Sequence, residues 1–163
     1  MTMSKSIRGV LIDPHSKTIS VVSVAHSAAY KGICDLIDAP LICKVNLGGP
    51  NRETLFLDDE GLFKDWQEFF ALGEYPYPLA GKGLILGTDD EGESVSSQFD
   101  IRLLAPAVRW LSAQEAADMG NAQAEAVRAV VDAANAQSPA NFFHIANAPS
   151  LEVDPDTGKA RAA

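Results

Sequence analysis

"PLAGKGLILGTDDEG" (residues 78–92) decides the fold, because it encodes a buried strand between a tight loop and an acidic turn. Its middle, "GLILGT" (83–88), is a short apolar run bounded by glycines, which predicts a strand. Pro76 and Pro78 restrict the backbone before it and predict an irregular crossing loop. The glycines of "GKGLILG" favour a tight loop over a phosphate-binding loop, since that motif needs a helix after the glycines and here a strand follows.

Two hairpins are expected on the N-terminal side of this strand. "IRGVLID" (7–13) and "TISVVSV" (18–24) are rich in β-branched residues and flank the turn residues "PHSK". "LICKVNL" (41–47) and "ETLFLDD" (53–59) flank the glycine-containing loop "GGPNR". With residues 83–88, these four segments predict a mainly antiparallel sheet.

A helix over residues 28–38 is expected to cover one face of this sheet. Ser27 is its expected N-cap and Pro40 ends it. Its apolar residues recur at the spacing of one helical face: Tyr30, Ile33, Cys34 and Ile37.

The C-terminal third predicts a long helix rich in alanine. Ser112 and Glu115 have capping-box spacing, which predicts a helix over 113–137. Residues 96–105 and 108–112 are predicted to be extended. The run of Leu62, Trp66 and Phe70, with Phe63 and Phe69 beside it, has helical spacing and predicts a short helix or an ordered loop.

The fold class is therefore predicted as α+β: a mainly antiparallel sheet built from hairpins, one covering helix and a long Ala-rich C-terminal helix. A chain of 163 residues that is 47% hydrophobic can bury one sizeable core. We expect a single domain over residues 5–137. Residues 138–163 are expected to be a C-terminal tail that is at least partly disordered, above all in its last dozen residues.

The negative charge is concentrated in one part of the sequence. Residues 53–93 contain eleven of the 22 acidic residues and two of the 13 basic ones, so they carry the whole net charge of −9. Such a charge argues against direct nucleic-acid binding. It favours a basic protein as partner.

The tetrapeptide DDEG occurs twice, at residues 58–61 and 89–92, each time after an apolar run. Asp at the first position and Gly at the fourth suit a type I turn followed by a left-handed glycine, so both copies are predicted to be the same turn. A functional interpretation is that both turns share one exposed surface, with aromatic residues beside it. The candidate partner-binding residues are Asp58, Asp59, Glu60, Trp66, Tyr75, Tyr77, Asp89, Asp90, Glu91 and Glu93.

No catalytic residue, metal ligand or cofactor site is identified from the sequence. His15, His26 and His144 lack metal-site spacing, and no G-x-S-x-G motif is present. Cys34 and Cys43 are interpreted as buried, reduced thiols. No apolar run has the length of about 20 residues that crosses a membrane, and the N-terminus lacks a signal-peptide core, so a cytoplasmic protein is expected.

Three stretches resemble an uncharacterised family of small proteins carried by phages, plasmids and other bacterial mobile elements. They are "LIDPHSKTISVV" (11–22), "LFLDDEGL" (55–62) and "FFALGEYPYPLAGKGLILGTDDEGES" (69–94). The resemblance covers roughly residues 7–95 and leaves the long helix and the tail unmatched. It implies an α+β fold and a mobile-element setting, and it brings no activity, cofactor or catalytic residue.

The first functional hypothesis is an accessory protein of a mobile genetic element that binds a basic host or defence protein through the acidic 53–93 region. One alternative is a small metal-dependent enzyme whose carboxylates bind a divalent ion. A second alternative is a structural protein that self-assembles as a homo-oligomer through the 113–137 helix. The hypotheses differ in whether the carboxylates, an ion or the long helix makes the decisive contact.

Overall fold

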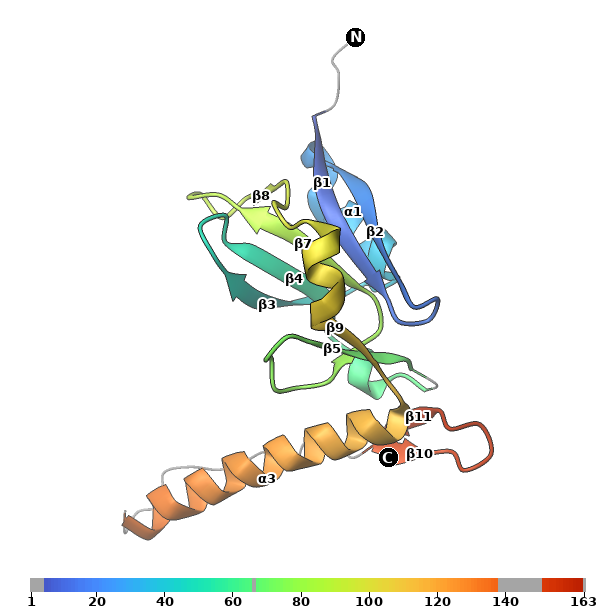
Figure 1. Cartoon of the computed structure of the whole chain (residues 1–163). Coiled ribbons are helices and arrows are strands. Elements are labelled where there is room, and N and C mark those ends of the chain that lie inside the picture. The colour runs from blue at the N-terminus through green and yellow to red at the C-terminus, as the bar shows by residue number, and fades with distance from the viewer. Residues whose placement is uncertain (1–4, 66, 138–150, 163) are drawn as a thin grey trace.

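The structure is a computed structural model that describes residues 5–65, 67–137 and 151–162 (Figure 1). It is an α+β fold, as predicted, with a six-stranded antiparallel main sheet in the order β2-β1-β7-β4-β3 and a short strand β8 paired to β7. The strands of the main sheet are β1 (Ser6–Asp13), β2 (Thr18–Ala25), β3 (Ile42–Gly48), β4 (Glu53–Asp58), β7 (Gly83–Thr88) and β8 (Ser94–Val95). Both predicted hairpins and the 83–88 strand are confirmed.

β7 is the central strand, and its side chains join two separate cores. It pairs with β1 on one side and with β4 on the other. Leu84, Ile85 and Leu86 are all fully buried. Leu84 and Leu86 enter the core under α1, whereas Ile85 enters the core on the opposite face, because successive side chains of a strand point to opposite faces.

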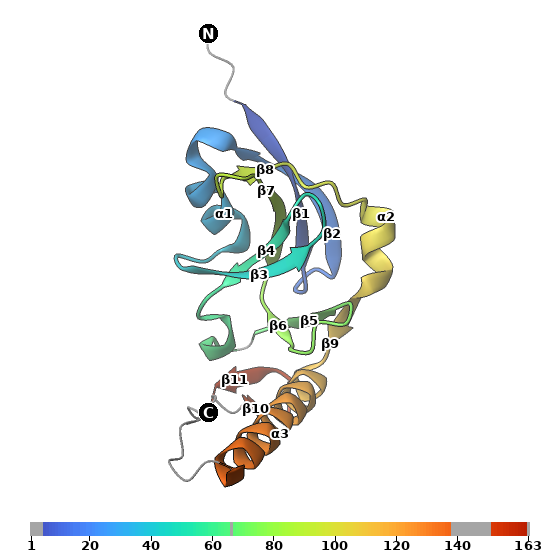
Figure 2. The ribbon, with the colours of Figure 1, turned by 90° about the vertical axis from the view of Figure 1, so that its left-hand side faces the viewer.

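The helix α1 (Ala29–Ile37) covers one face of the main sheet through its buried residues Ile33 and Ile37 (Figure 2). The covering helix is thus confirmed, but its predicted cap is wrong. Ser27 lies in a 3₁₀ turn, η1 (His26–Ala28), and the N-cap residue Ala28 has no side-chain cap. The helix ends at Asp38, which is left-handed with φ 55°, two residues before Pro40.

A second, small sheet lies beyond the other core, with strands β5 (Phe69–Leu72), β6 (Leu79–Ala80) and β9 (Val108–Leu111) in the order β6-β5-β9. The predicted short helix or ordered loop around Leu62–Phe70 is wrong for Phe69 and Phe70, which lie in strand β5. The segment forms a 3₁₀ turn, η2 (Gly61–Phe63), and then a strand. Phe69 and Phe70 are both buried on opposite faces of β5, in different cores, which explains why a strand replaces a one-sided helix.

The prediction of extended chain over 96–105 is also wrong in its second half. Residues Ile101–Leu104 form a short helix, α2, followed by the 3₁₀ turn η3 (Ala105–Ala107). Asp100 caps α2, since its carboxylate accepts the N–H of Arg102 at 2.8 Å. The extended prediction for 108–112 is confirmed by β9.

The long helix α3 (Ala113–Gln137) begins with the predicted capping box. Ser112 Oγ accepts the N–H of Glu115 at 3.1 Å, and the Ser112 N–H donates to the Glu115 carboxylate at 3.4 Å. Buried residues in α3 are confined to its first turns, and the helix then extends away from the sheets (Figure 1). Among the helices in the described residues, none is both long and apolar enough to span a membrane.

The end of the chain differs from the predicted disordered tail. β10 (Leu151–Val153) and β11 (Ala160–Ala162) form an antiparallel hairpin. Ala160 is fully buried against the small sheet and the start of α3, and its backbone bridges Gln67. The remainder of the predicted tail, residues 138–150, lies outside the described residues.

Candidate functional site

The two DDEG turns lie at opposite ends of the main sheet. They follow β4 and β7, and these strands are antiparallel neighbours in which Leu55 pairs with Ile85. Asp89 is therefore level with Asn51, seven residues before Asp58 along β4, and at about 3.3 Å per residue the two turns are roughly 23 Å apart. The expectation that both turns share one acidic surface is wrong.

In the first acidic turn (residues 58–61), Asp58 and Gly61 are buried, whereas Asp59 and Glu60 are exposed. The side chain of Asp58 is only 5% exposed and forms an ion pair with Lys64. Its Oδ1 atom also accepts the N–H of Glu60 at 3.0 Å. Gly61 is buried and is not left-handed. A Cβ atom on it would lie 3.1 Å from the carbonyl oxygen of Ala80, so this glycine allows the close approach of two segments.

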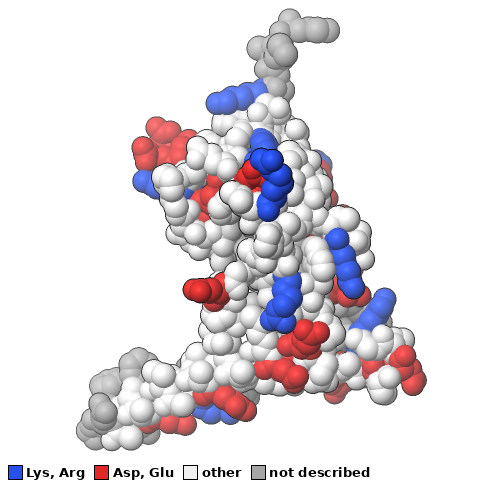
Figure 3. All heavy atoms as spheres, viewed as in Figure 1, with Lys and Arg blue, Asp and Glu red and all other residues white. Residues whose placement is uncertain are grey.

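The second acidic turn (residues 89–93) has the predicted geometry. Asp89 Oδ1 accepts the N–H groups of Glu91 at 3.0 Å and Glu93 at 2.8 Å. Gly92 is left-handed with φ 86°, and its N–H donates to the carbonyl of Asp89. The side chain of Asp90 is 93% exposed and pairs with Arg52 at 2.9 Å. In Figure 3, a group of acidic side chains projects at the upper left, where Figure 1 shows the β7–β8 end of the sheet, and a basic side chain lies beneath it.

Two of the three aromatic candidates, Tyr75 and Tyr77, form a pair near Cys43. Tyr75 and Tyr77, in the β5–β6 loop, have ring centroids 5.6 Å apart. Burial raises the pKa of Tyr75, and Cys43 contributes to the same rise. Burial also raises the pKa of the Cys43 thiol, with a further contribution from Asp59. Cys43 therefore lies near both the aromatic pair and the first turn, whereas Trp66 lies outside the described residues.

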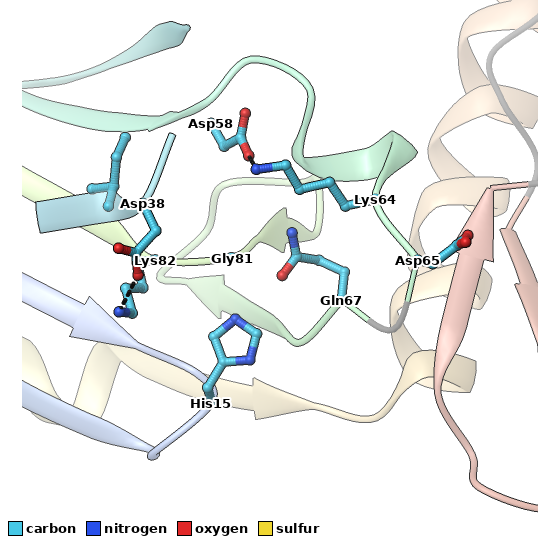
Figure 4. Close-up of a pocket in the computed structure, with 9 residues that line it drawn as sticks. His15, Asp38, Asp58, Lys64, Asp65, Gln67, Gly81 and Lys82 are labelled. Atoms are coloured by element: carbon cyan, nitrogen blue, oxygen red, sulfur yellow. Dashed lines mark hydrogen bonds and ion pairs between the residues drawn. The ribbon is translucent and has the colours of Figure 1, made fainter. Parts of the chain in front are cut away.

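A cleft of about 250 Å³, which the sequence did not predict, lies beside the first turn (Figure 4). It is lined by segments from the β1–β2 turn, the end of α1, the end of β4, the 61–67 segment and the β6–β7 turn. The lining residues are His15, Ile37, Asp38, Asp58, Lys64, Asp65, Gln67, Gly81 and Lys82. The three stretches that carry the family resemblance all reach this cleft, through His15, Asp58 and Lys82.

Charges of both signs line the cleft, and four of them form two ion pairs. Lys82 Nζ lies 2.5 Å from Asp38 Oδ2, and Lys64 pairs with Asp58. The hydrogen bond to Asp38 raises the pKa of Lys82, which favours the protonated form of this amine. Within the described ranges, no three His, Cys, Asp or Glu side chains are grouped to hold a metal ion. The charged and polar side chains that line the cleft can bind charged or polar groups.

Glu53, one of the eleven acidic residues of the 53–93 region, is buried with 3% exposure. Its Oε1 atom accepts two hydrogen bonds of 2.7 Å, from Asn51 Nδ2 and from the N–H of Gln98. Its Oε2 atom has no partner among the described residues. Glu53 therefore holds the segment after β8 against the start of β4, and alternation along "ETLFLDD" could have indicated that it points inward.

Comparison with known proteins gives one distant relative. The uncharacterized protein y4iR of Sinorhizobium fredii (strain NBRC 101917 / NGR234) is 32% identical over 79 residues. The match covers 48% of this chain and 48% of that protein, so the chain spans about half the length of the curated relative it matches. No family model and no solved structure matches. The chain is thus similar to an uncharacterized protein over half its length, and the similarity brings no activity with it.

Proposed function

We propose that this protein is a small acidic interaction protein of a mobile genetic element that binds a basic host or defence protein without catalysing a reaction. The observation that carries the proposal is the exposed second acidic turn, where one Arg52–Asp90 ion pair accompanies four carboxylates, those of Asp89, Asp90, Glu91 and Glu93. The mobile-element setting rests on the family resemblance alone.

The separation of the two turns narrows the proposed contact to the second one. The side chain of Asp58 is buried and already paired with Lys64, so it has little charge to offer a partner protein. The second turn is held by the hydrogen bonds of Asp89, which leaves Asp90, Glu91 and Glu93 projecting from a defined backbone. Exposed charges of one sign on a fixed turn speed association with an oppositely charged surface and set its orientation.

The test compares two triple variants of equal net charge. The turn variant is Asp90→Asn, Glu91→Gln and Glu93→Gln, which keeps Asp89 and therefore the turn. The control variant is Asp118→Asn, Glu125→Gln and Asp132→Asn, which removes the same charge from α3. Tagged proteins are used to capture partners from host lysate at low and high salt, and captured proteins are identified by mass spectrometry.

Wild type and the control variant should capture the same basic protein, with less captured at high salt because screening weakens exposed charge pairs. The turn variant should lose it. The affinity of the purified partner should likewise be equal for wild type and the control variant and lower for the turn variant. Equal capture by the turn variant and wild type, or capture that does not respond to salt, would refute the proposal.

A further inference from the structure

The cleft beside the first acidic turn contains one fixed charge of each sign. The side chain of Asp58 is 5% exposed and that of Lys82 is 25% exposed, so both are held in the walls. Their partners are more exposed, Lys64 at 41% and Asp38 at 70%. In each pair the wall residue is thus the fixed member, and the partner can turn toward solvent.

The two pairs have opposite polarity. On one wall, the fixed carboxylate of Asp58 pairs with the more exposed Lys64. On the other wall, the fixed ammonium group of Lys82 pairs with the more exposed Asp38. The Lys82–Asp38 pair is partly exposed, and exposed ion pairs contribute little to stability, so replacing Asp38 by a ligand group costs little. The buried carboxylate of Asp58 still requires a cation, whether from the protein or from a ligand.

Gln67 provides a fixed polar group between these walls (Figure 4). It is 8% exposed; its Nε2 donates to the carbonyl of Gly61 at 3.2 Å and its Oε1 accepts the N–H of Glu68 at 3.3 Å. Gly81 is left-handed with φ 75°, and a Cβ atom on it would lie 3.3 Å from Gln67 Nε2. The amide is therefore fixed in place while one of its N–H bonds has no partner assigned among the described residues, and a primary amide has two.

From this arrangement we infer that the cleft binds a small zwitterion of the size of a free α-amino acid. The ligand ammonium group takes the place of Lys64 on Asp58, and the ligand carboxylate takes the place of Asp38 on Lys82. The Gln67 amide supplies a further polar contact. The cleft volume of about 250 Å³ suits such a molecule and is smaller than the roughly 300–1,000 Å³ of drug-sized pockets.

The experiment is an NMR titration of the ¹⁵N-labelled full chain with glycine, acetate and methylammonium as probes. Glycine should give saturable shifts of the backbone amides of Gly81 and Lys82 and of the Gln67 side-chain amide. Acetate and methylammonium each carry one of the two charges, so each should bind at least about tenfold more weakly than glycine, because one charge-assisted contact is missing.

Three variants make the inference falsifiable. Lys82→Gln removes the fixed cation and should weaken glycine binding at least about tenfold. Asp38→Asn removes the competing counter-ion and should tighten binding by up to about fivefold. Lys31→Gln disrupts a matched ion pair, Lys31–Asp35, on the exposed side of α1 and should leave binding unchanged.

The Asp38→Asn variant retains every wall residue, so its result does not depend on the stability of Lys82→Gln. Absence of glycine shifts at the cleft overturns the inference. So does equal binding of acetate and glycine, which would make the cleft an anion site. Weaker glycine binding by Asp38→Asn would overturn it as well.

Discussion

The two DDEG turns have the same four residues and different structures. In both, the first aspartate accepts the N–H of the residue two positions later, Glu60 or Glu91, at 3.0 Å. The glycines differ. Gly61 allows a close approach, since a Cβ atom on it would lie only 3.1 Å from the carbonyl oxygen of Ala80, whereas Gly92 is left-handed and has open space around it. The tetrapeptide therefore encodes the hydrogen bond of its first aspartate. The reason for its glycine depends on the neighbouring segments, which crowd Gly61 and leave Gly92 open.

The largest difference between the turns should appear when an aspartate is truncated. Asp58→Ala removes the buried partner of Lys64 and the acceptor for Glu60, and it should destabilise the fold by about 2–4 kcal/mol. Asp90→Ala removes only an exposed pair with Arg52 and should cost no more than about 1 kcal/mol. Urea unfolding of both variants measures this. Similar losses would show that burial does not distinguish the turns.

The glycines offer a sharper test, because asparagine tolerates left-handed backbone better than alanine does. At residue 92, Gly→Ala should cost about 1 kcal/mol and Gly→Asn less, since only conformation matters there. At residue 61, Gly→Ala should cost about 1–3 kcal/mol through overpacking, and Gly→Asn should cost more because it is larger. Midpoints of thermal unfolding for the four variants give the order. The same order at both positions would contradict the comparison.

A smaller effect is expected at Glu53, the buried acid near the second turn. Glu53→Gln keeps an oxygen for Asn51 and Gln98 and replaces a charged group whose second oxygen has no partner among the described residues. The stability change should stay within about 1 kcal/mol in either direction, because lost charge-assisted bonding is offset by lower desolvation. Glu53→Ala should be clearly more destabilising in the same unfolding assay. If both substitutions cost the same, the hydrogen bonds of Glu53 do not hold the segment after β8.

The smallest effect concerns Asp100, whose carboxylate also accepts the N–H two residues later, here from Arg102. The hydrogen bonds from the Arg102 side chain and backbone lower the pKa of Asp100 to about 2. Because this pKa lies below the unfolded value of about 3.9, the carboxylate stabilises the fold above about pH 4, and this contribution is lost as the pH falls through about 2. An NMR titration of Asp100 should give that midpoint, and Arg102→Gln should raise it. A midpoint near 4 in wild type would contradict the role of Arg102.

The sequence predicted those parts of the fold whose causes are local. Alternation and turn residues indicated both early hairpins, and the spacing of Ser112 and Glu115 located the start of α3. The strand β5 was missed because Phe69 and Phe70 pack into different cores, and neither core is visible in a short window. The helical spacing of Leu62, Trp66 and Phe70 favoured a helix instead.

The candidate site was less predictable, because it depends on how distant segments pair. The acidic turns seemed equivalent in sequence, yet the antiparallel pairing of β4 with β7 separates them. The cleft is assembled from five segments, and Gln67 had no feature in the sequence that marked it as buried. The sequence showed Lys82 as part of a glycine-rich loop and gave no sign that it lines a cleft.

The central position of β7 also limits how early the chain can fold during its synthesis. β1 is an inner strand of the finished sheet, yet its pairing of Val10 with Ile85 cannot form until β7 has been made. During translation, the first hairpin and α1 therefore keep a strand edge and an apolar face uncovered until β7 has been made. In this interval aggregation or chaperone binding competes most strongly with folding. A ribosome stalled before residue 83 should carry a nascent chain that is sensitive to protease, and one stalled well beyond residue 111 should carry a protected one.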